Sequence, residues 1–213
     1  MKYKAFTFNP ICENTYILWD ESTRQAAIVD AGMYDERDMD VVRSFVEENG
    51  LGLSLSLQTH THFDHVSGLP FLFDTYGLRP MFHPNDERIY NAMPSFAGLA
   101  GFSLRHDLPR PEKYLSDGDE VWLGESSIKV IHTPGHTPGG LCLYSESGNL
   151  LLSGDTLFCE SVGRTDLPGG SLDDIMESIK GRLLSLPQDT IVLSGHGMST
   201  TIGWEAKYNP YLM

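Results

Sequence analysis

Four short segments of the sequence carry side chains of the kind that bind metal ions. The densest is the six-residue run His-Thr-His-Phe-Asp-His at 60–65. So many histidines in one run are improbable by chance in a chain of 213 residues with only 8 histidines. Three later turns each add one candidate. Together the segments predict a metal centre with seven ligands: His60, His62, Asp64, His65, His136, Asp155 and His196.

The spacing within the 60–65 run favours two metal ions rather than one. In an extended chain, alternate side chains point to the same side, so His60 and His62 can converge on one ion. Where the chain then turns into a helix, Asp64 and His65 can point to a second ion a few ångströms away. Two such ions can share a water and provide hydroxide near neutral pH. The predicted chemistry is therefore hydrolysis without a serine, cysteine or lysine nucleophile.

Each of the three later candidates follows an apolar strand and lies beside glycine or other small residues. The turns are Thr-Pro-Gly-His-Thr at 133–137, Ser-Gly-Asp-Thr at 153–156 and Ser-Gly-His-Gly at 194–197. Glycine lets the backbone turn sharply, so a side chain at a strand end can face a shared centre. We expect these turns to present their ligands to the same centre as the 60–65 run.

Short strands and two helices are expected to position the ligands. Strands are predicted at 2–8, 15–19, 26–29, 53–57, 121–123, 128–132, 141–144, 150–152 and 191–193, the first three as an antiparallel meander. Helical spacing of apolar residues predicts a helix over 35–49. A second helix begins at Ser171, where Ser-Leu-Asp-Asp can form a capping box, and ends before Pro187. Two strand runs, each closed by a helix, predict stacked sheets flanked by helices.

The domain organisation is simple. No internal repeat or low-complexity linker divides the chain, so residues 1–213 are expected to form a single domain. At 84–111 we expect a partly helical flap, because proline and glycine, including Pro94 and Gly98, interrupt any single helical pattern. The chain ends soon after His196, so no separate C-terminal helical domain is expected.

Composition and charge exclude several classes of protein. The net charge of -14 and the lack of a Lys/Arg cluster oppose binding to nucleic acid. No stretch approaches the ~18 apolar residues of a membrane helix, and the N-terminus lacks an apolar signal region. The 3 cysteines lie outside any CxxC pattern, which fits reduced thiols. We expect a cytoplasmic protein that acts on a small molecule, with no nucleic-acid, membrane or protein partner.

The order of the ligands along nearly the whole chain resembles that of the metallo-β-lactamase superfamily. The resemblance implies an α/β (α+β) fold, the four-layer αββα metallo-β-lactamase-like sandwich. It places the first metal on His60, His62 and His136. It places the second metal on Asp64, His65 and His196, with Asp155 as the bridge. Both aspartates thereby become catalytic, since Asp64 also orients the bridging solvent. Two divalent ions are implied, zinc first, with iron or manganese as alternatives.

The substrate class is implied by two further features. Asp rather than Cys at position 155 and the Gly-Arg-Thr-Asp run at 163–166 resemble short single-domain glyoxalase II-like (hydroxyacylglutathione hydrolase-like) proteins. The resemblance implies hydrolysis of a thioester such as S-lactoylglutathione by a metal-bridging hydroxide. Arg164 follows the Asp155 turn and can bind a substrate carboxylate with two parallel hydrogen bonds. The alternative for Arg164 is a pair with nearby Asp166.

A second class of function stays open, because persulfide dioxygenases resemble this fold and also carry a Gly-Arg-Thr-Asp run. In that case His62, His136 and Asp155 hold a single non-haem iron, and the remaining ligands become hydrogen-bonding partners. The intact second set of ligands counts against it. Other ester or lactone hydrolases, nucleases and catalytically silent metal-binding domains are less favoured, given the complete ligand set and the acidic charge.

Overall fold

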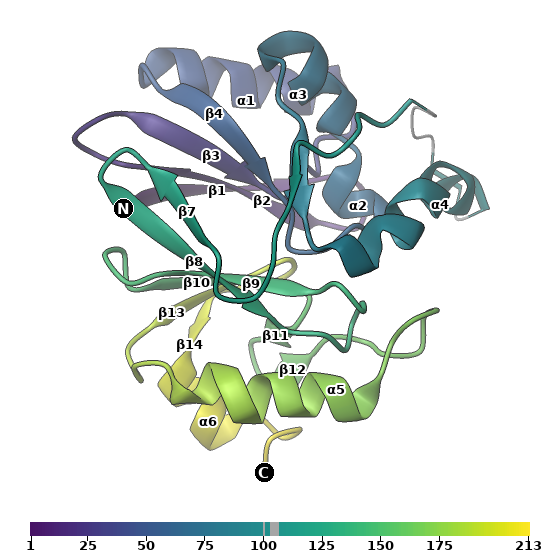
Figure 1. The fold of residues 1–213 in the computed structure, drawn as a ribbon, viewed down its shortest axis with the longest axis vertical. Coiled ribbons are helices and arrows are strands. Elements are labelled where there is room, and N and C mark those ends of the chain that lie inside the picture. Colours follow the sequence, from purple (N-terminus) through teal and green to yellow (C-terminus); the bar gives the residue numbers. More distant parts are fainter. Residues whose placement is uncertain (100, 103–106) are drawn as a thin grey trace.

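Two six-stranded β-sheets pack face to face in the computed structural model, which describes residues 1–99, 101–102 and 107–213 (Figure 1). The first sheet has the order β1-β2-β3-β4-β5-β6. Its strands are β1 (Lys2–Phe8), β2 (Glu13–Trp19), β3 (Gln25–Val29), β4 (Gly52–Leu57), β5 (Pro80–Phe82) and β6 (Lys113–Tyr114). From β1 to β3 the pairing is antiparallel, and from β3 to β6 it is parallel. The expected N-terminal meander is therefore present.

The second sheet has the order β14-β13-β10-β9-β8-β7. Its strands are β7 (Glu120–Leu123), β8 (Ser126–His132), β9 (Leu141–Ser145), β10 (Leu150–Gly154), β13 (Ile191–Ser194) and β14 (Thr200–Thr201). Strands β7 to β10 pair antiparallel, and β10 pairs parallel with β13. A separate small hairpin consists of β11 (Leu157–Phe158) and β12 (Ser161–Val162).

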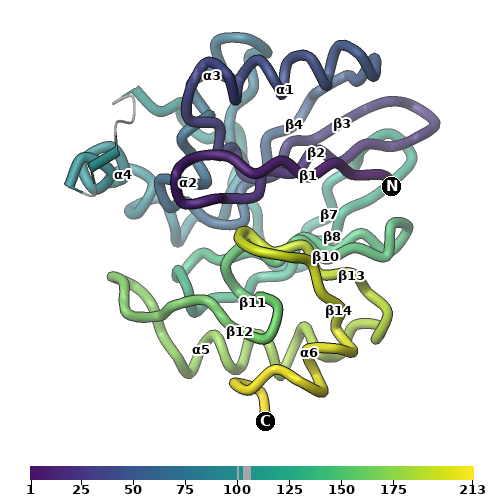
Figure 2. The backbone as a smooth tube through the Cα atoms, turned by 180° about the vertical axis from the view of Figure 1, so that it is seen from behind, coloured from purple at the N-terminus to yellow at the C-terminus, as the bar shows by residue number. Residues whose placement is uncertain are grey.

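Helices cover the outer face of each sheet. The first sheet is covered by α1 (Glu36–Glu48) and α3 (Leu69–Tyr76), and the second by α5 (Leu172–Glu177) and α6 (Ile202–Tyr208) (Figure 2). At one end of the sandwich lie α2 (Phe63–Val66) and α4 (Glu87–Leu99) (Figure 1). The layers are αββα, as expected from the sequence. Among the described residues, no helix has the length and apolarity needed to cross a bilayer.

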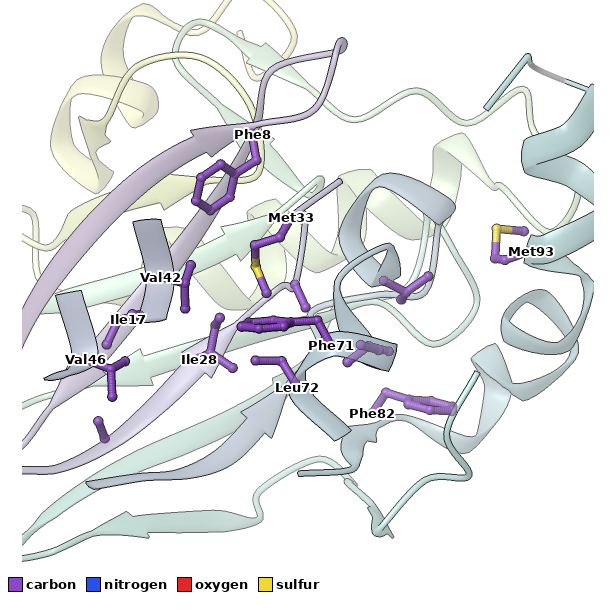
Figure 3. Close-up of a cluster of buried hydrophobic side chains, with 14 of the residues drawn as sticks. Phe8, Ile17, Ile28, Met33, Val42, Val46, Phe71, Leu72, Phe82 and Met93 are labelled. Atoms are coloured by element: carbon purple, nitrogen blue, oxygen red, sulfur yellow. The ribbon is translucent and has the colours of Figure 1, made fainter. Parts of the chain in front are cut away.

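Three layers of apolar side chains hold the sandwich together. Ile17 of β2 packs with Val42 of α1 and Leu72 of α3 in the outer core of the first sheet (Figure 3). The next residue, Leu18, belongs instead to the core between the two sheets. Successive side chains of a strand point to opposite faces, so Ile17 and Leu18, both apolar, contribute to cores on opposite sides of the sheet. A third core packs Ile175 of α5 and its neighbours on the outer face of the second sheet.

Two helices differ from the sequence prediction. The segment Leu69–Tyr76 forms α3 although no periodic pattern marks it, because its apolar residues are clustered around the helix. The segment Glu87–Leu99 forms the continuous helix α4 through Pro94, which was expected to interrupt it. Pro94 removes one backbone hydrogen bond, but buried side chains on the same helix, including Met93, offset this loss. Residues 100 and 103–106 of the expected flap lie outside the described residues.

The C-terminal predicted helix begins as expected and then changes its winding. Ser171 is the N-cap, and its side chain accepts a hydrogen bond from the backbone N–H of Asp174. After α5 the chain continues as a π-helical turn, η2 (Ser178–Arg182), and a 3₁₀ turn, η3 (Leu183–Ser185). The helix is therefore correctly predicted in position, but it is not a single regular α-helix.

Candidate metal centre

The predicted ligands lie where strands of both sheets end. Strands β8, β10 and β13 run in the same direction, because β8 and β10 both pair antiparallel with β9 and β10 pairs parallel with β13. Their carboxyl ends therefore share one edge, and the turns that follow carry His136, Asp155 and His196. From the first sheet, β4 ends at Leu57 and the chain passes through His60 into α2.

Three histidines form a first triad of possible metal ligands. One nitrogen from each of His60, His62 and His136 lies within 4.8 Å of the others. His62 Nδ1 and His136 Nε2 are 2.9 Å apart. His136 Nδ1 donates to the Arg164 carbonyl at 2.8 Å, so Nε2 is left with a lone pair that faces the triad. The first triad thus offers nitrogen donors only.

Asp64, His65 and His196 form a second triad with the same spacing limit of 4.8 Å. The Oδ2 atom of Asp64 lies 3.1 Å from His196 Nε2 and 3.3 Å from His65 Nε2. His196 is held from behind, because its Nδ1 donates to the backbone carbonyls of Ile11 and Cys12, both at 3.2 Å. The second triad therefore combines two imidazole nitrogens with one carboxylate.

Asp155 lies between the two triads. Its Oδ1 is 3.5 Å from His65 Nε2, and its Oδ2 is 3.5 Å from His136 Nε2 and 3.8 Å from His196 Nε2. Gly195 makes room for it, since a Cβ there would lie 2.3 Å from Asp155 Oδ1 and 2.7 Å from His65 Cε1. One carboxylate therefore faces a ligand of each triad, which is the arrangement expected of a bridge.

Asp30 is a site residue that sequence reasoning missed. Its Oδ1 accepts from the Thr59 N–H at 2.7 Å, and its Oδ2 accepts from Thr59 Oγ1 at 2.7 Å and from His65 Nδ1 at 3.0 Å. These bonds occupy both oxygens, so Asp30 orients His65 and leaves Nε2 for a metal. A signal was available, because Asp30 directly follows strand β3 as Asp155 directly follows β10.

Asp86 is a second residue that the sequence pattern did not reveal. Its Oδ1 accepts from the Gly139 N–H at 2.7 Å, and its Oδ2 accepts from Thr137 Oγ1 at 2.9 Å and from the Thr61 N–H at 3.2 Å. Burial raises the pKa of Asp86 to about 6, although the three hydrogen bonds oppose the shift. Asp86 ties the turn that carries His60 to the turn that carries His136.

Burial and neighbouring charges set the protonation of the ligands. Burial and the nearby imidazoles lower the pKa of His62 to about 3 and hold the pKa of His60 well below its usual value. Burial opposes ionisation of Asp64, but His65 and His196 outweigh it and lower the pKa of Asp64. For His65 and His196 burial disfavours the charged form, yet adjacent carboxylates raise both pKa values. Neutral rings and an ionised Asp64 are the forms that bind cations.

The donor set fits a pair of divalent cations. Three buried atoms at the centre have no hydrogen-bond partner among the described residues: His60 Nε2, His65 Nε2 and Asp155 Oδ1. A buried polar atom left unpaired costs roughly 1–3 kcal/mol, and a pair of cations, one at each triad, would satisfy all three. The donors are nitrogen and oxygen, which admit zinc, iron or manganese.

A comparison of the whole chain with known families agrees with this geometry. A family model described as the metallo-beta-lactamase superfamily matches residues 13–196, a stretch that contains both triads and Asp155. The chain belongs to the metallo-beta-lactamase superfamily. The resemblance to this superfamily is therefore confirmed, while the role of each residue stays a prediction.

Relatives within the superfamily are similar over almost their full length. A protein of Bacillus subtilis named probable metallo-hydrolase YqgX is 34% identical over 213 residues, which cover 100% of this chain and 98% of the relative. The hydroxyacylglutathione hydrolase GloC of Haemophilus influenzae is 33% identical over 207 residues, or 94% of this chain and 92% of the relative. These relatives support a metal-dependent hydrolase.

Solved superfamily structures confirm the predicted sandwich. The BLEG-1 B3 metallo-beta-lactamase has a TM-score of 0.89 and 34% identity, with 100% of both chains covered. TTHA1623 in a di-iron-bound form has a TM-score of 0.87 and 36% identity, covering 98% of this chain and 100% of that one. ETHE1 from Myxococcus xanthus has a TM-score of 0.80 and 26% identity, covering 99% and 84%.

A cavity of about 450 Å³ opens at the metal centre of this superfamily member, and Arg164 lies in its wall. The guanidinium of Arg164 donates two hydrogen bonds to Asp166, both at 2.7 Å. The alternative considered for Arg164, a pair with Asp166, is therefore present. Its role as a substrate anchor stays a prediction.

Proposed function

We propose that this protein is a metal-dependent thioester hydrolase of the glyoxalase II type, with S-lactoylglutathione as its model substrate. The position of Asp155 carries the proposal, because its two oxygens lie 3.5 Å from His65 Nε2 of one triad and 3.5 Å from His136 Nε2 of the other. Two triads around one carboxylate are suited to a pair of divalent ions. The 33% identity to a hydroxyacylglutathione hydrolase supports the thioester as substrate class.

The protein side chains have defined tasks in this chemistry. A pair of divalent ions would supply a water of lowered pKa and an electrophile for the substrate carbonyl. Asp64 is ionised and buried beside both histidines of its triad, so it can accept a hydrogen bond from the attacking water and orient it. Phe63, Phe96 and Phe158 line the cavity and exclude bulk water from the scissile bond.

The proposal includes the identity of the metal and the surroundings of the protein. Zinc is the proposed metal, with iron or manganese as alternatives. The substrate is a small molecule, and we propose no nucleic-acid, membrane or protein partner. The net charge of -14 supports the proposed absence of a nucleic-acid partner. A cytoplasmic location is supported by the free cysteines Cys12, Cys142 and Cys159.

A persulfide dioxygenase is the second candidate function. The likeness to ETHE1 from Myxococcus xanthus favours it, and the di-iron-bound form of TTHA1623 supports iron as the metal. In such an enzyme His62, His136 and Asp155 would hold one iron. The second triad favours the hydrolase, because a single iron leaves two histidines and a carboxylate without a metal.

Metal analysis combined with two assays distinguishes the candidates. Protein purified without added metal is analysed by mass spectrometry, and is then assayed with S-lactoylglutathione and, under air, with glutathione persulfide. We expect about two metal ions per chain and hydrolysis of the thioester bond of S-lactoylglutathione. One iron per chain, with oxygen consumed in the persulfide assay and no thioester cleavage, would overturn the proposal.

A matched pair of histidine variants shows whether turnover depends on the centre. His196→Gln removes a ligand of the second triad and should lower both metal content and hydrolysis. His83→Gln is the control, because His83 stacks on His132 with ring centroids 4.1 Å apart and belongs to neither triad. An equal loss in the two variants would indicate a general effect on folding.

A further inference from the structure

A second cavity, of about 380 Å³, adjoins the metal centre. It shares His62, Phe96 and Leu167 with the cavity that contains the metal ligands. His62 belongs to the first triad, so a molecule held at the metal centre can extend into this second space. We call it the α4 pocket, since α4 supplies five of its lining residues, and residues 167–169 also line it.

The wall from α4 follows from helical geometry. Arg88, Ala92 and Phe96 are four residues apart and therefore lie on one face, with Ile89 and Met93 beside them. Leu167, Pro168 and Pro138 complete a mostly apolar lining. Apart from His62, the polar side chains are Asn85 and Arg88, both near the N-terminal end of α4. The pocket is thus apolar along its length and cationic near that end.

The guanidinium of Arg88 is available to a ligand. No described carboxylate forms an ion pair with it, and the adjacent Glu87 is engaged with the hydroxyl of Tyr114. Arg164, the arginine in the neighbouring cavity, is instead held by two hydrogen bonds to Asp166. An arginine binds a carboxylate through two parallel hydrogen bonds.

We propose that the α4 pocket binds the acyl arm of the substrate, an unbranched apolar chain whose terminal carboxylate pairs with Arg88. The proposal rests on the proposed thioester hydrolysis, because the acyl carbonyl must then lie beside the first triad at His62. The larger cavity, whose lining includes Arg164 and members of both triads, is left for the thiol part. Arg88 is eight residues from Phe96, about 12 Å along the helix axis, which a six-carbon arm and the arginine side chain together can span.

Three thioesters of one thiol, N-acetylcysteamine, test the pocket by kinetics. Their acyl groups are acetyl, hexanoyl and adipoyl. We expect kcat/KM to be about tenfold higher for hexanoyl than for acetyl, because apolar surface is buried. A further gain of about tenfold is expected for adipoyl, because its carboxylate pairs with Arg88. Equal values for hexanoyl and adipoyl in the wild-type enzyme would overturn the proposal.

Substitutions then assign the two gains to the two parts of the pocket. Arg88→Gln should reduce the ratio of adipoyl to hexanoyl to about one, whereas Arg37→Gln should keep the wild-type ratio. Arg37 is the matched control, because it is an exposed arginine of α1 and lines neither cavity. Ala92→Phe fills the pocket from an exposed position and should abolish the advantage of hexanoyl over acetyl. If the ratio of adipoyl to hexanoyl stays at its wild-type value in Arg88→Gln, Arg88 does not bind the carboxylate of the acyl arm.

Calorimetric titration separates this proposal from the hydrolase itself. If the wild-type protein cleaves neither S-lactoylglutathione nor any of the three thioesters, the proposed function fails, but binding of adipate and hexanoate can still be compared. We expect the wild-type protein to bind adipate about tenfold more tightly than hexanoate. The Arg88→Gln variant should bind adipate and hexanoate equally. Equal affinities in the wild-type protein would overturn the pocket proposal alone.

Discussion

The two triads of candidate metal ligands differ in charge. The first consists of three imidazoles, and burial keeps His60 and His62 neutral by lowering their pKa values. The second contains the carboxylate of Asp64, which stays ionised and raises the pKa of His65 and His196. A metal ion at the first triad therefore meets the neutral rings of His60 and His62, whereas an ion at the second triad meets a negative charge and must compete with protons.

The triads are also supported differently. In the second triad, His65 donates to a buried carboxylate, Asp30, at 3.0 Å. In the first, His136 donates to a backbone carbonyl, and Asp86 holds the surrounding turns rather than a ligand. A carboxylate partner raises the basicity of a histidine more than a carbonyl does. Five predictions test this difference between the triads.

Asp155→Ala should have the largest effect, because Asp155 faces ligands of both triads. We expect loss of most bound metal and a fall in hydrolysis of about 10³-fold or more. Metal analysis and turnover of S-lactoylglutathione measure the two losses together. Retention of both ions would mean that the triads are independent sites and that Asp155 is no bridge.

Asp64→Asn removes the negative charge of the second triad and leaves the first triad intact. We expect one ion per chain to be retained, and activity to fall about 10²-fold. The reciprocal variant, His62→Gln, should weaken the first site instead. Titration of the metal-free protein with zinc gives the stoichiometry. Loss of both ions in Asp64→Asn would show that the first triad does not hold a metal by itself.

Asp30→Asn should weaken the second site without removing a ligand. The substituted amide keeps the size of the side chain but loses one acceptor oxygen, so the orientation of His65 and the basicity of its ring should decrease. We expect affinity for the second ion to fall roughly 10-fold to 100-fold. Competition with a chelator measures the two affinities. A larger loss at the first site would contradict the assignment of Asp30 to His65.

Asp86→Asn is the matched change on the side of the first triad. The amide can accept at one oxygen only, so at least one of the donors Thr61, Thr137 and Gly139 loses its acceptor. We expect the free energy of unfolding to fall by roughly 1–3 kcal/mol, with a modest loss of affinity at the first site. Urea unfolding of the metal-free protein checks the stability. An unchanged unfolding midpoint would show that Asp86 does not tie the turns.

Lowering the pH should weaken metal binding more at the second triad than at the first, and this is the smallest of the five expected effects. The pKa values of His65 and His196 are raised, so protons compete with metal at the second triad as the pH falls. The pKa of His62, about 3, leaves its nitrogen free at much lower pH. Metal affinity at the second triad should therefore rise with pH. For each proton that the metal displaces, the rise is at most about tenfold per pH unit, and the affinity of the first site should change less. Zinc titrations at several pH values measure this; equal slopes would contradict it.

Much of the fold could be predicted from local patterns. Strand positions follow from short apolar runs between turn-forming residues, and helix positions follow from apolar periodicity and from capping residues such as Ser171. The exceptions have a physical cause. Helix α3 is too uniformly apolar to show a period, and α4 continues through Pro94 because tertiary packing outweighs one lost hydrogen bond.

The sequence by itself determined which residues are candidate ligands, because each candidate is marked by its residue type and by a local turn at a strand end. Tertiary structure decided what surrounds the ligands. Asp30 meets His65 across 35 residues, and Asp86 meets Thr137 across 51. Such contacts, and the α4 pocket that places Arg88 near the metal centre, arise from packing between distant segments, which no local pattern records.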